Sequence, residues 1–208
     1  MRNIMDKFRM DGQAAVGTGG AGLLGRQFCR TLAQAGAGVV VADLNRMAAI
    51  TEAETLEKDG YTAIGVGLDV TDPNSTEEMV AAALNRLGRL DVLVCSAAMD
   101  PKFDSQHQAE QASNAFETYP LDAWRQALDV NLTGMFLCAQ AAVKPMLEQD
   151  HGVIINICST YGLVGPDQRI YERPGQPPQY KPVFYSVTKA GVLGLTPVSY
   201  PHLTLPTI

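Results

Sequence analysis

Tyr185 and Lys189 stand four positions apart in the stretch Tyr-Ser-Val-Thr-Lys. On a helix this spacing places both side chains on one face, where an ammonium group favours the ionised form of a nearby phenol. A tyrosine whose pKa falls from ~10 towards neutrality can donate and accept a proton in the physiological range. The pair therefore predicts acid-base chemistry, although the same spacing also occurs on solvated helix surfaces.

A second candidate is the glycine-rich stretch from Gly17 to Gly25, which follows an apolar run and precedes a helical pattern. At a strand-to-helix turn, Gly19, Gly22 and Gly25 would allow a tight turn, close approach to a phosphate, and close packing of helix on strand. The helix N-terminus attracts an anion without help from Lys or Arg, and none occurs between positions 12 and 25. The stretch predicts a pyrophosphate site; a glycine turn without a ligand is the alternative.

Asp43 ends the apolar, β-branched run that begins at Gly38, eighteen positions after Gly25. In a dinucleotide site, a carboxylate at this point accepts hydrogen bonds from the adenosine ribose and repels a 2′-phosphate. Asp43 therefore favours NAD over NADP, unless it only begins a loop.

Alternating strand and helix patterns must position these residues. Strands are expected at 13–16, 38–43, 61–68, 91–95 and 152–158, and helices at 23–34, 46–59, 73–87, 121–144 and 183–194. Irregular stretches at 99–120 and 160–182 interrupt the alternation, and we expect the first to lie near a substrate. Short apolar strands joined by helices predict an α/β fold, with a doubly wound parallel sheet in a three-layer α/β/α arrangement.

Composition narrows the class of partner. The 208 residues are 46% hydrophobic and 18% charged, which suits one domain with a substantial core. A formal charge of -6 argues against a nucleic-acid partner, so a small-molecule substrate is expected. The chain has no run of about 18 apolar residues and no signal-peptide pattern, so we expect a soluble cytoplasmic protein without a membrane partner.

The four cysteines are far apart and lie in apolar segments, which predicts reduced core thiols rather than disulfides or zinc ligands. They are Cys29, Cys95, Cys138 and Cys158. The three histidines are equally dispersed, so no metal site is expected.

From about Phe8 to about Thr196 the chain resembles a short-chain dehydrogenase/reductase, and the matching motifs occur in the family's order. The resemblance implies a Rossmann-type fold and NAD as cofactor. It implies cofactor contacts from Thr18, Gly19, Gly22, Leu23, Leu24, Gly25, Asp43, Leu44, Asp69, Val70, Ser96, Ala97, Ala98, Tyr185 and Lys189.

The same resemblance implies four catalytic residues, which are Asn131, Ser159, Tyr185 and Lys189. Tyr185 would exchange a proton with the substrate oxygen, and Ser159 would hydrogen-bond that oxygen. Lys189 would lower the tyrosine pKa and hold the nicotinamide ribose, while the Asn131 backbone would hold a water on the proton path. The implied activity is NAD-dependent transfer of a hydride between nicotinamide and a secondary alcohol or ketone. The implied alternative is a dinucleotide-binding regulator without turnover.

Three departures from the family pattern stand out. The glycine spacing is more typical of the extended branch of the family, and Cys95-Ser96-Ala97-Ala98 replaces its Asn-Asn-Ala-Gly. Ser159 and Tyr185 are 26 positions apart, a longer separation than is usual. The added segment, 166–182, is polar and predicts a hydroxylated or sugar-acid-like substrate at its border, with a plain surface insertion as the alternative.

The end of the chain departs from the family after Thr196. Pro197, Pro201 and Pro206 predict that the last helix stops before Pro197, with no regular structure after it. The stretch 197–208 is similar to a translated sequencing adaptor, so we expect a family domain at 1–196 that lacks its last strands and leaves the fifth strand as an exposed apolar edge. We expect such a fragment to be poorly soluble or loosely folded, and inactive. By resemblance, the full-length form would be a homodimer or homotetramer.

Overall fold

The computed structural model describes residues 4–100, 114–175 and 178–202. Its strands form one parallel sheet in the order β3-β2-β1-β4-β5, so the order reverses between β1 and β4. This confirms the expected Rossmann-type α/β fold. The strands are β1 (Ala14–Thr18), β2 (Gly38–Asp43), β3 (Ala63–Gly67), β4 (Val92–Cys95) and β5 (Val153–Asn156).

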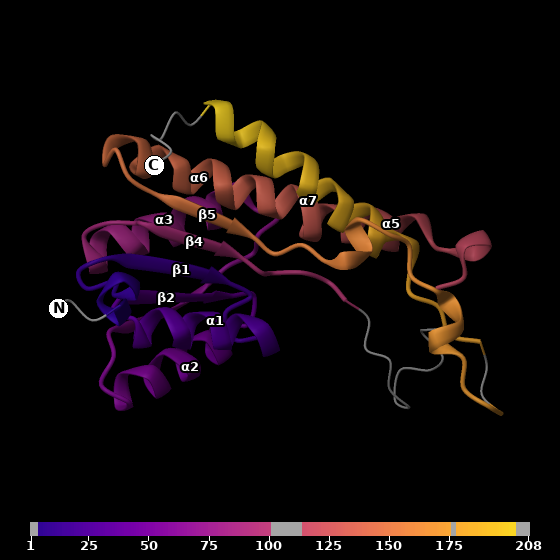
Figure 1. Cartoon of the computed structure of the whole chain (residues 1–208), viewed down its shortest axis with the longest axis horizontal. Coiled ribbons are helices and arrows are strands. Elements are labelled where there is room, and N and C mark those ends of the chain that lie inside the picture. The colour runs from indigo at the N-terminus through magenta and orange to yellow at the C-terminus, as the bar shows by residue number, and fades with distance from the viewer. Residues whose placement is uncertain (1–3, 101–113, 176–177, 203–208) are drawn as a thin grey trace.

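Helices cover both faces of the sheet (Figure 1). One face packs against α1 (Leu23–Gln34) and α2 (Arg46–Lys58). The other packs against α3 (Pro73–Leu87), α6 (Gly134–Glu148) and α7 (Val183–His202). Beyond the carboxyl ends of the strands, at the right of Figure 1, the chain extends outward through α5 (Leu121–Leu128).

Strand β2 shows why the interior positions of the strands are apolar. Val39 and Val41 pack into the core formed with α1 and α2, whereas Val40 and Ala42 pack into the core on the opposite face. All four side chains are fully buried. A strand covered on both faces needs apolar side chains at every position, which is the pattern that the sequence shows.

A buried carboxylate fixes the start of the central strands. The Asp91 side chain is fully buried, and its Oδ2 accepts a hydrogen bond from the Ala14 amide at 2.8 Å. Arg89 donates to both carboxylate oxygens at 2.7 Å, which provides the opposite charge. The Asp91 backbone also bonds to Ala14 and to Val153. One residue therefore joins the first residues of β1, β4 and β5.

The helix expected at 121–144 is longer and contains an irregularity. Helix α5 continues through a π-helical stretch, η3 (Asp129–Thr133), into α6, which runs to Glu148 with Pro145 inside it. A π-helical turn includes one more residue than an α-helical turn, and such turns often occur at functional sites. Asn131, one of the predicted catalytic residues, lies in the middle of this stretch.

The predicted end of the last helix before Pro197 is wrong, because α7 continues to His202 and passes through Pro201 as well. A proline removes one backbone donor from a helix, but the bonds on either side of it remain available. The hydroxyl of Thr196 bonds to the Val192 carbonyl at 2.9 Å, immediately before the proline. Pro206 lies outside the described residues.

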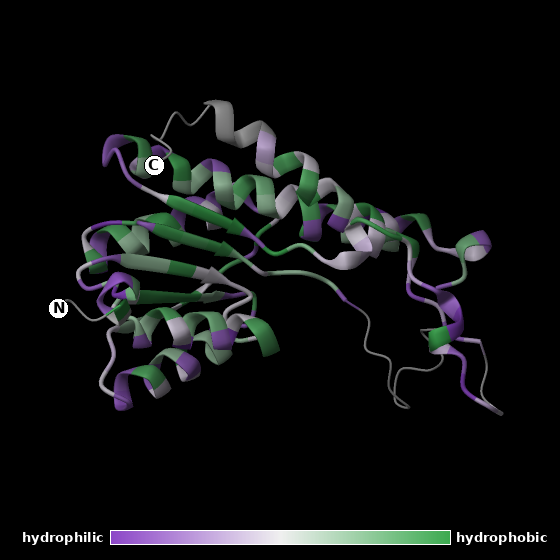
Figure 2. Ribbon diagram, viewed as in Figure 1, coloured by the Kyte–Doolittle hydropathy of each residue, from purple (hydrophilic) through white to green (hydrophobic). Residues whose placement is uncertain are grey.

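The two irregular stretches contain only short helical turns where they are described. These are η2 (Phe116–Thr118), η4 (Thr160–Gly162) and η5 (Gln168–Tyr171), and a further turn, η1 (Ile4–Phe8), precedes β1. Residues 101–113 and 176–177, which belong to the two stretches, lie outside the described residues. Figure 2 shows that the segment around η5 is largely hydrophilic, in contrast to the apolar strands.

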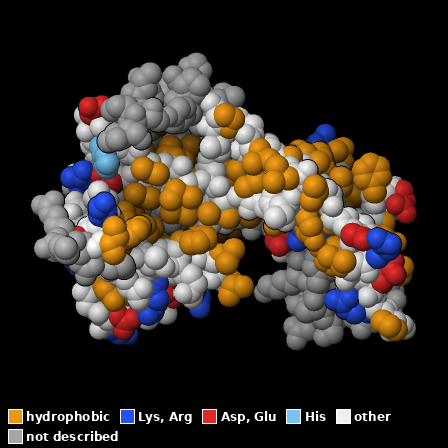
Figure 3. Space-filling model, viewed as in Figure 1, with side chains coloured by type: hydrophobic (Ala, Val, Ile, Leu, Met, Phe, Trp, Pro, Cys, Tyr) orange, Lys and Arg blue, Asp and Glu red, His pale blue; other side chains and the backbone are white. Residues whose placement is uncertain are grey.

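Strand β5 forms an edge of the sheet, as expected. Val153 and Ile155 pair with Val92 and Val94, so they point to the α1 and α2 face of the sheet, yet they are 49% and 43% exposed. Figure 3 shows hydrophobic side chains gathered over this part of the sheet. Within the described part of the chain, β5 pairs only with β4.

We predict that Asp91→Ala lowers the free energy of unfolding by roughly 3 kcal/mol, because it leaves the Ala14 amide without its buried acceptor and Arg89 without its partner. Urea unfolding followed by circular dichroism measures the change. Asp122→Ala is the matched control, because Asp122 forms an exposed pair with Arg125 and should leave the midpoint almost unchanged. Equal effects of the two substitutions would contradict the role given to Asp91.

Candidate functional site

The glycine turn connects β1 to α1 through a tightly packed backbone. Gly19 has a φ of +63°, in the left-handed region, and its carbonyl accepts a bond from the Gly22 amide at 2.9 Å. A Cβ on Gly25 would overlap the same Gly19 carbonyl. Gly20, which the three-residue rhythm omitted, is also constrained, because a Cβ there would lie 2.8 Å from the Gly17 carbonyl oxygen. Backbone atoms make these contacts, so they cannot move aside.

The first turn of α1 is open. Its N-cap is Gly22, and no side chain caps the helix there. Leu23 and Leu24 follow with 85% and 57% of their surface exposed. The positive end of the helix dipole and the exposed side chains of Leu23 and Leu24 are therefore accessible to a ligand. A ligand with an anionic group next to an apolar group would fit both features.

Asp43 lies beside this turn. One carboxylate oxygen accepts a bond from the Ala21 amide at 3.1 Å, and the other accepts from the Asn45 amide at 3.0 Å. A carboxylate has about four lone-pair directions, so Asp43 can accept further bonds from a ligand. Leu44, the next residue, is 76% exposed. The predicted ribose acceptor thus also holds the glycine turn against the end of β2.

The ends of β1 and β4 meet at the reversal of strand order. The Thr18 hydroxyl accepts bonds from the amides of Ser96 and Ala97, both at 3.1 Å, and the Ser96 hydroxyl donates to the Thr18 carbonyl at 2.6 Å. A Cβ on Gly19 would lie 2.9 Å from the Ala97 Cα. Thr18 is buried, so its side chain holds the two strand ends together, while Ala98 is exposed beyond them.

Asp69 and Val70, which follow β3, differ in their exposure. Asp69 is exposed, and bonds from Thr71 hold the pKa of its carboxyl below the usual range. The Val70 side chain is buried against Gly134, so only its backbone could contact a ligand.

Asn131 holds the chain after β4 in place. Its Oδ1 accepts a bond from the Met99 amide at 2.6 Å, and its Nδ2 donates to the Met99 carbonyl at 3.0 Å. The same Nδ2 lies 3.4 Å from the hydroxyl of Thr188 on α7. The buried amide therefore connects the π-helical stretch to residues 96–100 after β4 (the β4 loop) and to the helix that carries Tyr185.

Ser159 follows β5 and begins the short turn η4, where its Oγ accepts a bond from the Tyr161 amide at 3.2 Å. This turn packs closely on α7, because a Cβ on Gly162 would lie 2.6 Å from the Lys189 carbonyl oxygen. Tyr161 places its ring edge-on to that of Tyr185, with 6.3 Å between the centroids. The structure therefore brings Ser159, Tyr185 and Lys189 into one region, although 26 positions separate the first two.

Lys189 is almost fully buried, and its ammonium donates to the Ile157 carbonyl at 2.7 Å. Burial lowers the pKa of this lysine, since the charged form loses hydration. Its Nζ lies 6.0 Å from the centre of the Tyr185 ring. The lysine predicted to act on Tyr185 thus lies near its ring. The bond to the Ile157 carbonyl holds the ammonium in place, whereas burial disfavours its charged form.

Sequence reasoning missed a second cation beside Tyr185. Lys181 is buried, and its Nζ lies 3.8 Å from the ring centre. The same ammonium forms an ion pair with Asp100, in the segment after β4. Lys181 precedes Tyr185 by four positions, the same spacing at which Lys189 follows it. That repeated spacing could have pointed to Lys181.

The segment 166–182 lies beside these residues. Its side-chain amide at Gln168 pairs with the backbone of Lys181 at 2.9 Å and 3.1 Å. The hydroxyl of Tyr171 lies 3.3 Å from that of Tyr161, and burial raises the Tyr171 pKa. The charged Asp167 and Arg169 pair with each other on the surface. The Gln168 bonds thus join the two ends of the segment, and Tyr171 attaches the segment to η4.

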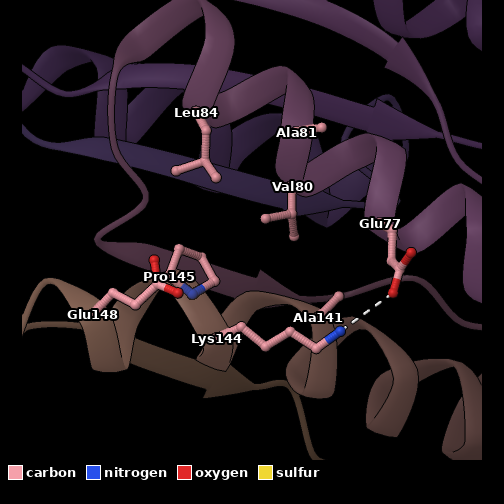
Figure 4. A pocket seen from close by; sticks show the side chains of 8 residues that line it. All are labelled: Glu77, Val80, Ala81, Leu84, Ala141, Lys144, Pro145 and Glu148. Atoms are coloured by element: carbon pink, nitrogen blue, oxygen red, sulfur yellow. Dashed lines mark hydrogen bonds and ion pairs between the residues drawn. The ribbon is translucent and has the colours of Figure 1, made fainter.

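A cavity of about 460 Å³ lies between this segment and the start of α7. Its walls include apolar side chains and several polar groups. They are Asn114, Ala115, Phe116, Glu117, Gly165, Pro166, Gln168, Tyr180, Lys181, Pro182, Val183, Ser186 and Val187. A second cavity, of about 370 Å³, lies between α3 and α6, where Lys144 forms an ion pair with Glu77 (Figure 4). None of the predicted site residues lines either cavity.

The four cysteines are free thiols; Cys29, Cys95 and Cys138 are buried and Cys158 is partly buried. In the described ranges, no cluster of His, Cys, Asp and Glu could hold a metal ion. Likewise, none of the helices in these ranges has the length and apolar character needed to span a bilayer.

Comparison with known proteins decides the family. A model of the short chain dehydrogenases matches residues 13–200, which include the glycine turn, Asp43, Ser159 and the Tyr185–Lys189 pair. The chain belongs to this family. Its members are NAD(P)-dependent oxidoreductases.

Three relatives are informative. The trans-4-hydroxycyclohexanecarboxylate dehydrogenase of Sinomonas cyclohexanicum is 35% identical over 197 residues, which are 92% of this chain and 66% of that protein. The D-threitol dehydrogenase of Mycolicibacterium smegmatis is 33% identical over 92% of this chain and 64% of its own length. The crystal structure of a gluconate 5-dehydrogenase from Burkholderia cenocepacia, in complex with NADP and tartrate, superposes with a TM-score of 0.78 at 28% identity. This alignment covers 97% of the present chain and 71% of that one. The chain spans 63% to 66% of the length of such sequence relatives.

We predict that Gly25→Ala weakens NADH binding roughly tenfold or more and lowers the thermal midpoint, because its Cβ must displace the Gly19 carbonyl. Gly194→Ala in α7 is the control, since no atom lies within 4 Å of the added Cβ and alanine favours a helix. Fluorescence titration with NADH and a thermal melt give the two measurements. Normal binding by Gly25→Ala would contradict the packing described for the turn.

Proposed function

We propose that this protein is an NAD-dependent oxidoreductase that interconverts a secondary alcohol and a ketone on a small hydroxylated or acidic substrate. The observation that carries this proposal is the packing of η4 on α7, which brings Ser159 to the helix of Tyr185 and Lys189. A serine, a tyrosine and a lysine in one region can hold a substrate oxygen and move its proton.

The residues present fit a dinucleotide. The backbone leaves no room for a Cβ at Gly19, Gly20 or Gly25, and the uncapped start of α1 suits a pyrophosphate. Asp43 would hold the adenosine ribose, and the segment Ser96–Ala98 would lie along the cofactor at the reversal of strand order. When bound, the nicotinamide supplies hydride transfer to or from the substrate carbon.

Tyr185 would act as the acid and base. In ketone reduction its hydroxyl donates a proton to the substrate oxygen, and in alcohol oxidation its ionised form accepts that proton. Ser159 would donate a hydrogen bond to the same oxygen and orient the substrate. Lys189 would stabilise the ionised tyrosine, and its bond to the Ile157 carbonyl keeps the ammonium in position. Asn131 would support the proton path by fixing the β4 loop beside α7.

The proposed substrate class depends on the segment 166–182. This segment contacts Tyr161, which contacts Tyr185, and it forms part of the wall of the cavity at the start of α7. Polar groups such as Asn114, Gln168 and Ser186 in that wall suit a hydroxylated molecule. The names of the three relatives mention a cyclic hydroxy acid, a tetritol and gluconate, all of which carry hydroxyl groups. A screen of polyols and sugar acids with NAD is therefore the first turnover assay.

We predict that Tyr185→Phe lowers turnover roughly a hundredfold or more while NADH binding stays nearly unchanged, because only the proton-transferring hydroxyl is lost. Lys189→Ala should impair both turnover and binding. Tyr61→Phe, on the opposite side of the sheet near α2, is the control and should keep full activity. If Tyr185→Phe retained more than a small fraction of the activity, the acid-base assignment would be wrong.

We predict that Asp43→Ala narrows the preference for NAD over NADP, because it removes the negative charge that repels the 2′-phosphate. Titration of the parent and the variant with both cofactors measures the two affinities. Asp59→Ala, at the far end of α2, is the matched loss of one carboxylate and should not alter the preference. Equal affinity of the parent chain for both cofactors would refute the proposed preference.

A further inference from the structure

The ring of Tyr185 has a cation over its face. The Lys181 ammonium lies 3.8 Å from the ring centre, compared with 6.0 Å for the Lys189 ammonium. An ammonium at this distance is attracted to the π-electrons of the ring, and the attraction is stronger where water is excluded. Only 8% of the Lys181 side chain is exposed.

Ionisation of the phenol strengthens this contact. The phenolate spreads negative charge into the ring, so a cation over the ring face favours the ionised form. The ammonium does not need to touch the hydroxyl to have this effect. The contact with Lys181 therefore does not use the Tyr185 hydroxyl.

Asp100 limits the charge that Lys181 contributes. Its carboxylate pairs with the Lys181 ammonium and is 46% exposed. Asp100 comes from the segment after β4, whose position Asn131 fixes through Met99. The charge near the ring is thus the balance of a buried cation and a partly hydrated anion from another part of the chain.

The other titratable groups around Tyr185 come from each neighbouring element. Among the described residues, Tyr161 belongs to η4, Tyr171 to η5, Lys189 to α7, and Cys158 to the segment after β5. The tyrosines are neutral when protonated, and Lys189 is a cation whose pKa burial lowers. Lys181 and Asp100 are the charged pair nearest to the ring face in this group.

We propose that Lys181 is a positioning residue that stabilises the ionised form of Tyr185 through its ring, and that Asp100 weakens this effect by pairing with Lys181. The assignment of Tyr185 as the acid and base rests on the proposed oxidoreductase function. The interaction between Lys181 and the Tyr185 ring does not. Two lysines would then stabilise the ionised form of one tyrosine. Lys181 precedes α7, and Lys189 lies within it.

The test is the ionisation of Tyr185 itself. Tyrosinate absorbance is followed against pH in the full chain, and the same titration of the Tyr185→Phe variant of each protein is subtracted. Lys181→Met keeps the length and apolar stem of the side chain but removes the charge. We expect it to raise the Tyr185 midpoint by roughly one pH unit, the size of a partly buried cation–π contact.

Two further variants test the direction in which the Tyr185 midpoint shifts. Lys181→Arg keeps the charge over the ring and should leave the midpoint close to that of the parent. Asp100→Asn removes the counter-charge and should lower the midpoint. An unchanged midpoint in Lys181→Met, or a rise in Asp100→Asn, would overturn the proposal. If Lys181→Met fails to fold, as judged by circular dichroism, the direction of the Asp100→Asn shift decides.

Turnover separates this proposal from the proposed function. If the chain is active, the pH profile of kcat should move in the same direction as the Tyr185 midpoint in each variant. If no variant and not even the parent turns over a substrate, shifted midpoints would still support the Lys181 proposal, while the assay would count against the oxidoreductase. Active proteins with unmoved midpoints would support the oxidoreductase and overturn the role given to Lys181.

Discussion

The hydroxyl of Thr18 fixes the point around which the site is arranged. By accepting two backbone hydrogen bonds from the end of β4, it holds the two central strands together at the place where the strand order reverses. The chains that leave these strands diverge, and a ligand can lie between them. Gly19 must lack a side chain because Ala97 occupies that space. The positions of the glycine turn, of the start of α1 and of Ser96–Ala98 all follow from this junction.

The strands and helices that the sequence predicted best have strong local signals. Helix α1, helix α3 and strand β2 have the bounds expected from their patterns. Glycines lie before and after the first, a proline begins the second, and the third contains three consecutive valines. The failures have a different cause. Pro197 is a local signal that α7 overrides, and the π-helical turn at Asn131 accompanies bonds to Met99 and Thr188, which lie elsewhere in the chain.

Residue types and spacing were sufficient to predict the pair Tyr185 and Lys189, because few side chains provide acid-base chemistry near neutral pH. Ser159 was predicted from the resemblance to the family. The electrostatic surroundings of Tyr185 were not predictable in the same way. Lys181 and Asp100 are 81 positions apart, and their pairing depends on how the β4 loop and the segment 166–182 fold over α7. The position of that segment could be anticipated from its length and polarity, but the ring contact required three-dimensional structure. The sequence thus predicted the candidate reacting groups, whereas their electrostatic surroundings depend on the fold.

The distribution of thiols has a practical consequence. Burial raises the pKa of Cys29 and of Cys138 to about 12, and it raises the pKa of Cys95 as well, so these three thiols rarely ionise. Cys158 is only partly buried. Its sulfur contacts the carbonyls of Ser159 and Lys189. A mild alkylating reagent would therefore react first at Cys158, and a fluorescent label placed there would report on movements between the end of β5 and α7 without any engineered cysteine.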